Sequence, residues 1–168
     1  MTMWGAGFYG DPCRECGYSW SITPEEATAL ILDTPRRYAE LLDGADGSAR
    51  HPDLTWSVTA YVEHVADNIR NWAERIVSAV AAGQTTLRPT DQDVVAAARA
   101  YESMPLATAL WSLGHSANIW ADAMAACAGR DFMFSHPTRG QQSLAELILT
   151  VAHDTAHHEW DIRRSLGA

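Results

Sequence analysis

Three histidines fall within six positions near the C-terminus, in the stretch VAHDTAHHEWDIRR at residues 151–164. His153 and His157 are four residues apart, so in a helix their imidazoles lie on the same side. Two imidazoles at this spacing can bind one metal ion, as they do in the HExxH helices of zinc proteases. The same pair can also belong to a solvated helix face that binds nothing. The spacing alone leaves both interpretations open.

A third histidine, His64, lies in the stretch WSVTAYVEHVADNIRNW at residues 56–72, one turn before Asn68. It stands at the border of the apolar stripe of a predicted helix. If His64 and the pair His153 and His157 face one core, three imidazoles converge on a site with an open fourth position. That arrangement is typical of catalytic rather than closed structural metal centres. The alternative is a hydrogen-bonded boundary histidine and a solvated pair.

Other polar and aromatic residues accompany this candidate metal site. Asp161 lies one turn beyond His157, where it could orient a ligand imidazole or act as a general base. It could equally be a surface aspartate paired with Arg163 or Arg164. Trp56 and Trp160 are expected to form pocket walls with Asn68. The remaining helical tryptophans are expected in the core, at positions Trp72, Trp111 and Trp120.

A second candidate site is the CxxC pair of Cys13 and Cys16 in the sequence CRECG. It resembles half of a zinc knuckle, in which two thiolates on a tight turn bind one ion and Gly17 permits the turn. A structural zinc needs four ligands, and the residues expected to complete the set are Cys127, His51 or His136. A redox-active pair and two reduced thiols packed in the arm are the other interpretations.

The elements that must position these residues are predominantly helical. Capping boxes at Thr23 with Glu26 and at Ser143 with Glu146 predict the start of a first and a last helix. Helical periodicity also predicts helices over 57–82 and from about 105 to 128, with shorter helical signal near residues 94–103. Pro35 is expected to kink or divide the first helix. The stretch DFMFSHP at 131–137 reads as a connector.

These elements predict an all-α fold, an antiparallel four-helix bundle in up-down-up-down order with an irregular N-terminal arm. The expected domains are a CxxC arm over residues 1–21 and a four-helix bundle domain over 22–168. In an up-down-up-down bundle, the helix carrying His64 and the last helix run parallel and lie diagonally across the core.

Composition restricts the classes of partner. The chain has 168 residues, a formal net charge of −9 and a pI of about 5.1. A protein of this charge repels phosphate backbones and anionic membrane surfaces, so nucleic acid and membrane are not expected partners. There is no recognisable signal peptide, and we expect a cytoplasmic protein that acts on a small-molecule substrate. A homodimer is compatible with the sequence.

The segments WSVTAYVEHVADNI and LILTVAHDTAHHEWDIRR, together with the CxxCG arm, resemble the DinB-like superfamily and especially its actinobacterial branch. The resemblance extends over nearly the whole chain. It implies a four-helix bundle with a divalent metal ion held by three histidines, which correspond here to His64, His153 and His157. Residues 94–116 depart from the family pattern, so substrate contacts there cannot be transferred.

The resemblance also implies a class of activity. Similar superfamily members transfer low-molecular-weight thiols, which makes a metal-dependent thiol S-transferase the leading expectation, with mycothiol as co-substrate. Zn²⁺ is the first candidate metal, and Ni²⁺ or Fe²⁺ also suit imidazole ligands. The alternatives are a metal-dependent hydrolase and a non-enzymatic stress protein that binds a metal or a small ligand.

Overall fold

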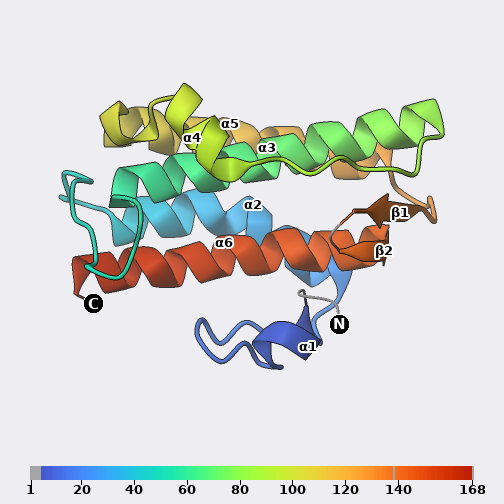
Figure 1. Ribbon diagram of the computed structural model, residues 1–168, viewed down its shortest axis with the longest axis horizontal. Helices are drawn as coiled ribbons and strands as arrows, with labels where there is room; N and C mark the ends of the chain where they lie inside the picture. The colour runs from blue at the N-terminus through green and yellow to red at the C-terminus, as the bar shows by residue number, and fades with distance from the viewer. Residues whose placement is uncertain (1–4, 138, 168) are drawn as a thin grey trace.

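The computed structural model describes residues 5–137 and 139–167 and consists mainly of four long helices lying side by side (Figure 1). These are α2 (Pro24–Leu41), α3 (Val58–Ala82), α5 (Leu106–Ala126) and α6 (Leu144–Leu166). The shorter elements are α1 (Ala6–Tyr9), α4 (Gln92–Ala98), the 3₁₀ helix η1 (Tyr101–Ser103), β1 (Met133–His136) and β2 (Gly140–Ser143). The predicted all-α class and four-helix bundle are confirmed. Residues 1–4 of the predicted arm lie outside the described residues.

The predicted helix ends are present in the structure. Thr23 and Ser143 each accept a hydrogen bond from the backbone of the glutamate three residues on, and both form complete capping boxes. Gly83 ends α3 in the left-handed conformation, with a φ of 63° that favours glycine. Pro35 lies inside α2, which continues past it as one helix. Short-range sequence signals therefore determine where the long helices begin and end.

Replacing Ser143 with alanine is expected to lower the free energy of unfolding by about 1 kcal/mol. The variant loses the acceptor of the Glu146 backbone N–H, which lies 3.2 Å from Ser143 Oγ. The midpoint of urea unfolding measures the effect. Ser78→Ala, at an exposed position inside α3, is the matched control and leaves the midpoint unchanged or slightly raised. Equal midpoints for the two variants would contradict the assigned cap.

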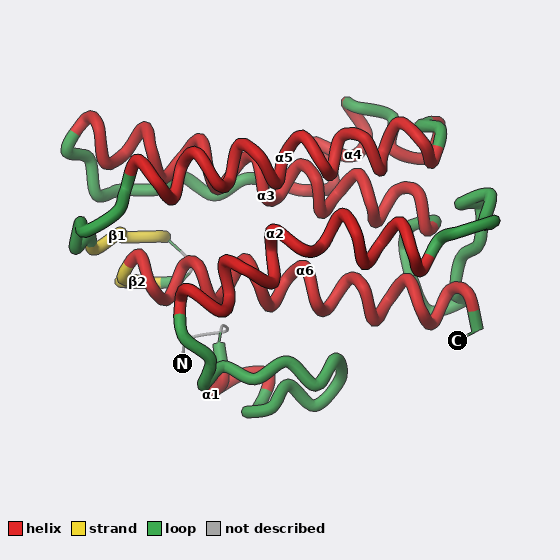
Figure 2. Tube along the Cα trace, turned by 180° about the vertical axis from the view of Figure 1, so that it is seen from behind, coloured by secondary structure: helices red, strands yellow, loops and turns green. Residues whose placement is uncertain are grey.

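The directions of the four helices differ from the predicted up-down-up-down order. Helix α3 packs against α5 and α6, and α2 packs against the other sides of the same two helices. Helices α3 and α5 run in the same direction, because residues 83–105 return along the length of the bundle before α5 begins (Figures 1 and 2). This long crossover is what allows two consecutive long helices to be parallel neighbours. Helices α3 and α6 are consequently adjacent rather than diagonal.

The predicted connector before α6 is instead a small hairpin. Strand β1 pairs with β2 in antiparallel register, with Met133 opposite Ser143 and His136 opposite Gly140. Along β1, Phe134 and His136 are buried while Met133 is exposed. This alternation has the period of a strand with one buried face, a signal too short to distinguish from a loop in the sequence. The hairpin leads directly into the Ser143 cap of α6.

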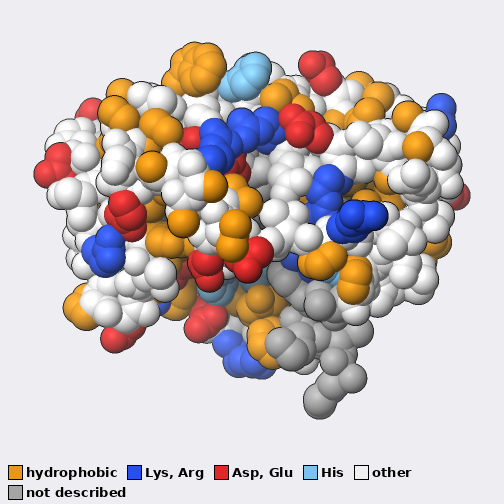
Figure 3. Space-filling model, turned by 45° about the horizontal axis from the view of Figure 1, so that its top comes forward, with side chains coloured by type: hydrophobic (Ala, Val, Ile, Leu, Met, Phe, Trp, Pro, Cys, Tyr) orange, Lys and Arg blue, Asp and Glu red, His pale blue; other side chains and the backbone are white. Residues whose placement is uncertain are grey.

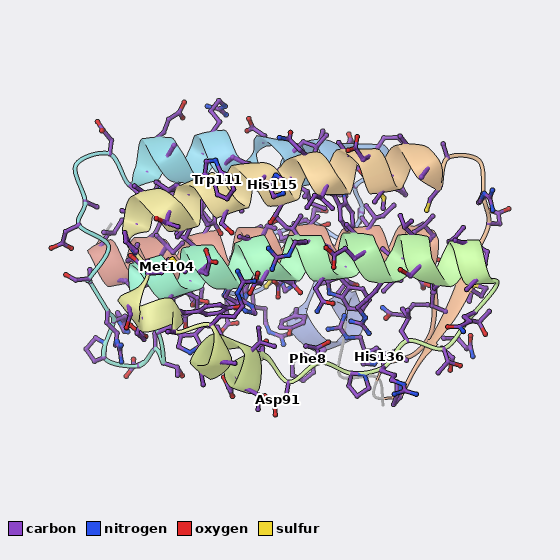
Figure 4. All side chains as sticks on the ribbon, turned by 90° about the horizontal axis from the view of Figure 1, so that it is seen from above. Phe8, Asp91, Met104, Trp111, His115 and His136 are labelled. Carbon is purple, nitrogen blue, oxygen red and sulfur yellow. The ribbon has the colours of Figure 1, made fainter. Side chains whose placement is uncertain are left out.

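Two of the three tryptophans expected in the core are buried there. Trp120 is fully buried and Trp72 nearly so, whereas 70% of Trp111 is exposed. Trp111 and His115 lie side by side on α5 (Figure 4), with ring centroids 5.5 Å apart and planes only 10° from parallel. The prediction for Trp111 was therefore wrong, because its side of α5 faces solvent and not a neighbouring helix. No helix among the described residues is long and apolar enough to cross a membrane.

Candidate functional site

Metal-ligand side chains gather in two groups on either side of α6. In each group the candidate ligand atoms all lie within 4.8 Å of one another. The interhelical site, between α3 and α6, consists of His64, Asp154 and His158. The arm site, between the N-terminal arm and α6, consists of Cys13, Cys16, His153 and His157.

The family resemblance implies that His64, His153 and His157 bind one metal ion, but the structure places His64 in one group and the other two in the second group. Among the described residues, no cluster of candidate ligands contains His64 together with His153 and His157. The reason lies in α6, which carries two i, i+4 pairs offset by one residue. An offset of one residue turns the direction of a helical side chain by about 100°. His153 and His157 consequently face the arm, while Asp154 and His158 face α3.

In the interhelical site, the Asp154 carboxylate lies between two imidazoles. Nε2 of His64 is 3.9 Å from Asp154 Oδ2, and Nε2 of His158 is 3.7 Å from Asp154 Oδ1. The two imidazole ring centroids are 4.8 Å apart. Two nitrogen atoms and one oxygen thus face a common centre, the kind of donor set that binds a divalent transition metal and leaves further positions open.

A second layer of side chains orients these ligands. The ring Nδ1 of His158 donates to Asp161 Oδ2 at 3.0 Å, which leaves Nε2 facing the site. Asp161 thus contacts the imidazole of His158 and not that of His157, and it also lies 3.5 Å from Arg164. Asn68 donates to Asp154 Oδ2 at 2.6 Å. Such contacts fix the tautomer and direction of metal ligands.

Burial keeps the imidazole of His64 neutral. The side chain is 7% exposed, and burial lowers its pKa to about 4, with a smaller contribution from the neighbouring His158. The Trp56 ring covers it, with ring centroids 4.9 Å apart. Nε2 of His64 is buried and has no hydrogen-bond partner within residues 5–137 and 139–167. A buried nitrogen without a partner is costly unless it binds something, and neutral imidazole is the form that binds metals.

The interhelical site opens into a cleft of about 650 Å³. His64, Asn68 and Asp154 line it on one side, and residues of the 83–105 crossover line the other, including Asp91, which also caps α4. The walls carry four arginines, Arg70, Arg75, Arg99 and Arg139. Arginine and acidic side chains adjoin near the centre of the face shown in Figure 3. The volume suits a small-molecule substrate.

Two of these arginines differ in their surroundings from the other two. Arg70 and Arg99 both contact the carboxylate of Asp67. Arg75 and Arg139 instead lie over the ring of Trp72, at 4.4 and 5.1 Å from its centroid. Burial lowers the pKa of Arg139 to about 10, so it remains protonated near neutral pH. The cleft thus places two guanidinium groups against an aromatic surface, a combination that can bind an anionic group on a ligand.

The two cysteines and Trp160 lie on the arm side of α6, beside His157. Cys13 and Cys16 face His153 and His157, two residues that were not expected in the cysteine site. In the described part of the chain, no candidate ligand cluster contains the residues that were expected to complete the cysteine site, which are Cys127, His51 and His136. Trp160 packs beside His157 with ring centroids 5.4 Å apart and does not line the cleft.

Comparison with known proteins agrees with this architecture. The fold is similar to that of YfiT from Bacillus subtilis, described as a probable metal-dependent hydrolase with an unusual four-helix bundle topology. The two chains share 17% sequence identity with a TM-score of 0.71, over 86% of this chain and 87% of that one. No curated protein matches the sequence. The family model described as the DinB superfamily matches residues 32–162, and the chain therefore belongs to the DinB superfamily.

Proposed function

We propose that the protein is a metal-dependent enzyme that activates a small nucleophile at the interhelical site. The observation that carries this proposal is the buried Nε2 of His64, which lacks a hydrogen-bond partner among the described residues and lies 3.9 Å from the Asp154 carboxylate. Together with His158, these groups fit a divalent ion such as Zn²⁺, Ni²⁺ or Fe²⁺. When bound, such an ion supplies Lewis acidity and lowers the pKa of its coordinated nucleophile.

The protein's own residues prepare the site and exclude water from it. Asp161 keeps His158 in the tautomer whose Nε2 faces the site, and Asn68 holds one oxygen of Asp154. Trp56 covers the inner side of His64 and keeps solvent from reaching it there. The electrophilic substrate binds in the cleft, where Arg75 and Arg139 hold an anionic group near Trp72. This pre-organisation limits the reaction to molecules that fill the cleft.

We assign thiol S-transfer as the reaction, with mycothiol as the nucleophile and a small anionic electrophile as the second substrate. The basis is the sequence resemblance to thiol-transferring superfamily members and the cleft beside the site, whose volume of about 650 Å³ is typical of small-molecule sites. Hydrolysis is the second candidate, because the structurally similar YfiT is described as a probable metal-dependent hydrolase. In both reactions the nucleophile loses its proton, bonds to the electrophilic carbon and displaces a leaving group from that carbon; the nucleophile is a thiol in one reaction and water in the other.

Metal analysis and turnover test the proposal together. Purified protein is expected to hold an ion that His64→Ala loses, and to conjugate mycothiol to an anionic electrophile only when that ion is present. His115→Ala, at an exposed histidine of α5, is the matched control and keeps both properties. Substrate loss without thiol would assign hydrolysis instead. Unchanged metal content and turnover in His64→Ala would refute the proposed site, and a bound ion without either reaction would indicate a non-enzymatic binding protein.

A further inference from the structure

We propose that the arm site is a second metal centre, a closed Cys₂His₂ zinc site that fixes the N-terminal arm against α6. Its ligands are Cys13 and Cys16 from the arm and His153 and His157 from α6. Two thiolates and two imidazoles form one of the common ligand sets of structural zinc. The site is separate from the interhelical site and does not depend on the function proposed for it.

The distances in the arm site suit a tetrahedral zinc ion. Cys13 Sγ lies 4.0 Å from Nδ1 of His157. In a tetrahedron with ordinary Zn–S and Zn–N bonds, sulfur and nitrogen are about 3.6 Å apart. An inward movement of a few tenths of an ångström brings this pair to the tetrahedral distance, and all four ligand atoms already lie within 4.8 Å of one another. The other ring nitrogen of His157 lies 3.5 Å from the Glu15 carboxylate, which leaves Nδ1 to face the thiols.

The backbone of the arm places both thiols on one tight turn. The Gly17 N–H donates to the Cys13 carbonyl at 2.9 Å, and the Cys13 N–H donates to the Tyr18 carbonyl at 2.8 Å. Gly17 has a φ of 74°, a left-handed conformation that favours glycine. This is the local structure that the CxxCG motif predicts. The Tyr18 hydroxyl then donates to the Leu149 carbonyl at 3.0 Å and docks the turn on α6.

An independent observation concerns His153, which is 3% exposed. Three rings of the arm enclose its imidazole, with centroid distances of 4.5 Å to Tyr9, 5.4 Å to Tyr18 and 4.6 Å to Trp20. Nε2 of His153 is buried and accepts or donates no hydrogen bond among the residues described. Because this buried nitrogen has no hydrogen-bond partner in the described part of the chain, its burial costs free energy unless an ion binds it.

The surroundings of the thiols favour a structural site over a redox-active pair. Cys13 is buried and Cys16 is half-buried, and both thiols face the two imidazoles of α6. Reactive CxxC cysteines instead lie in partially exposed, electropositive surroundings. A bound zinc ion would deprotonate both thiols without exposing them. With four protein ligands, the site leaves no position for a substrate and has a structural role.

Cobalt substitution tests the arm site without an activity assay. Co²⁺ bound by thiolates shows a sulfur-to-metal charge-transfer absorption, and the interhelical site contains no sulfur. Reduced full-length protein loaded with Co²⁺ is expected to show this band, and Cys16→Ser is expected to lose it together with one equivalent of metal. Cys127→Ser is the matched cysteine control and keeps the band. His64→Ala also keeps it, which separates the two metal sites.

Limited trypsin digestion tests whether the bound metal holds the arm against α6. Arg14 is exposed and lies between the two cysteines. Cleavage after Arg14 is expected to be at least about 10-fold faster in Cys16→Ser than in metal-loaded wild type, because an unbound arm opens more often. Circular dichroism of the variant confirms that the bundle is still folded.

The opposite results overturn the proposal. These are a charge-transfer band that survives Cys16→Ser, or reduced wild-type protein that binds no more Co²⁺ than Cys16→Ser does. A Cys13–Cys16 disulfide that forms in the presence of excess zinc would also refute it. If instead the band behaves as expected while His64→Ala keeps its full metal content, the arm site stands and the interhelical site fails.

Discussion

Replacing His158 with alanine is expected to remove the ion from the interhelical site and to lower kcat/KM more than about 100-fold. Replacing a residue that only supports a metal ligand already costs about 10–100-fold in affinity or activity, and loss of a ligand costs more. His158 is such a ligand candidate, with Nε2 3.7 Å from the Asp154 carboxylate. His157→Ala, one position earlier, is expected to leave this site intact because its side chain faces the arm.

Metal titration and steady-state kinetics of the two variants decide between two arrangements. The structure predicts that turnover depends on His158, whereas the family resemblance predicts dependence on His157. In the structural arrangement, His157→Ala changes the cobalt charge-transfer band of the arm site and not the turnover. If His157→Ala abolishes turnover while His158→Ala retains it, the ligand set of His64, Asp154 and His158 is wrong.

The second large effect concerns stability. Arg99→Met is expected to lower the free energy of unfolding by about 3 kcal/mol. The guanidinium lies 3.3 Å from Glu63, whose side chain is 1% exposed, and it also contacts Asp67. Burial, with a further contribution from Asp67, raises the pKa of Glu63, so its carboxylate depends on this cation. Arg99 itself is 36% exposed, but Glu63 is not, so removing the cation leaves a buried carboxylate without compensation.

Urea unfolding at neutral pH measures this loss. Arg36→Met is the control, since Arg36 forms ion pairs with Asp33 and Glu40 on an exposed part of α2, where solvent screens them and their loss changes the stability little. The double variant Glu63→Gln with Arg99→Met should recover part of the stability, because no unpaired charge is left at position 63. A loss in Arg99→Met no larger than in Arg36→Met would show that Glu63 does not need its partner.

Much of the fold could be predicted because its signals are local. Ser57 and Gly83 bound α3 in the sequence and in the structure, and the capping box at Ser143 begins α6 as expected. The directions of the helices are not a local property. They depend on the path of residues 83–105, which no periodicity in that segment reveals.

The site could be predicted only in part, for a related reason. Two histidines four residues apart, His153 and His157, are easily recognised as a candidate ligand pair. Asp154 and His158 have the same spacing and also offer metal ligands. The position of His158 nearer the middle of the apolar stripe of the last helix was the signal that it points into the bundle. The arm covers His153 because residues far apart in the sequence make contact, as Tyr18 and Leu149 do. Local sequence patterns do not reveal such contacts.

The crossover over residues 83–105 has a consequence for how this protein could diversify. It contributes Pro89, Thr90, Asp91, Gln92, Val95, Arg99 and Tyr101 to the cleft and none of the candidate metal ligands. The candidate metal ligands and most of one cleft wall thus come from separate segments of the chain, the ligands from α3 and α6 and the wall from the crossover. Mutations can accumulate in the crossover and change which molecule is admitted while the ligands on α3 and α6 stay the same. Exchanging this segment between superfamily members would then transfer substrate preference without transferring the metal site.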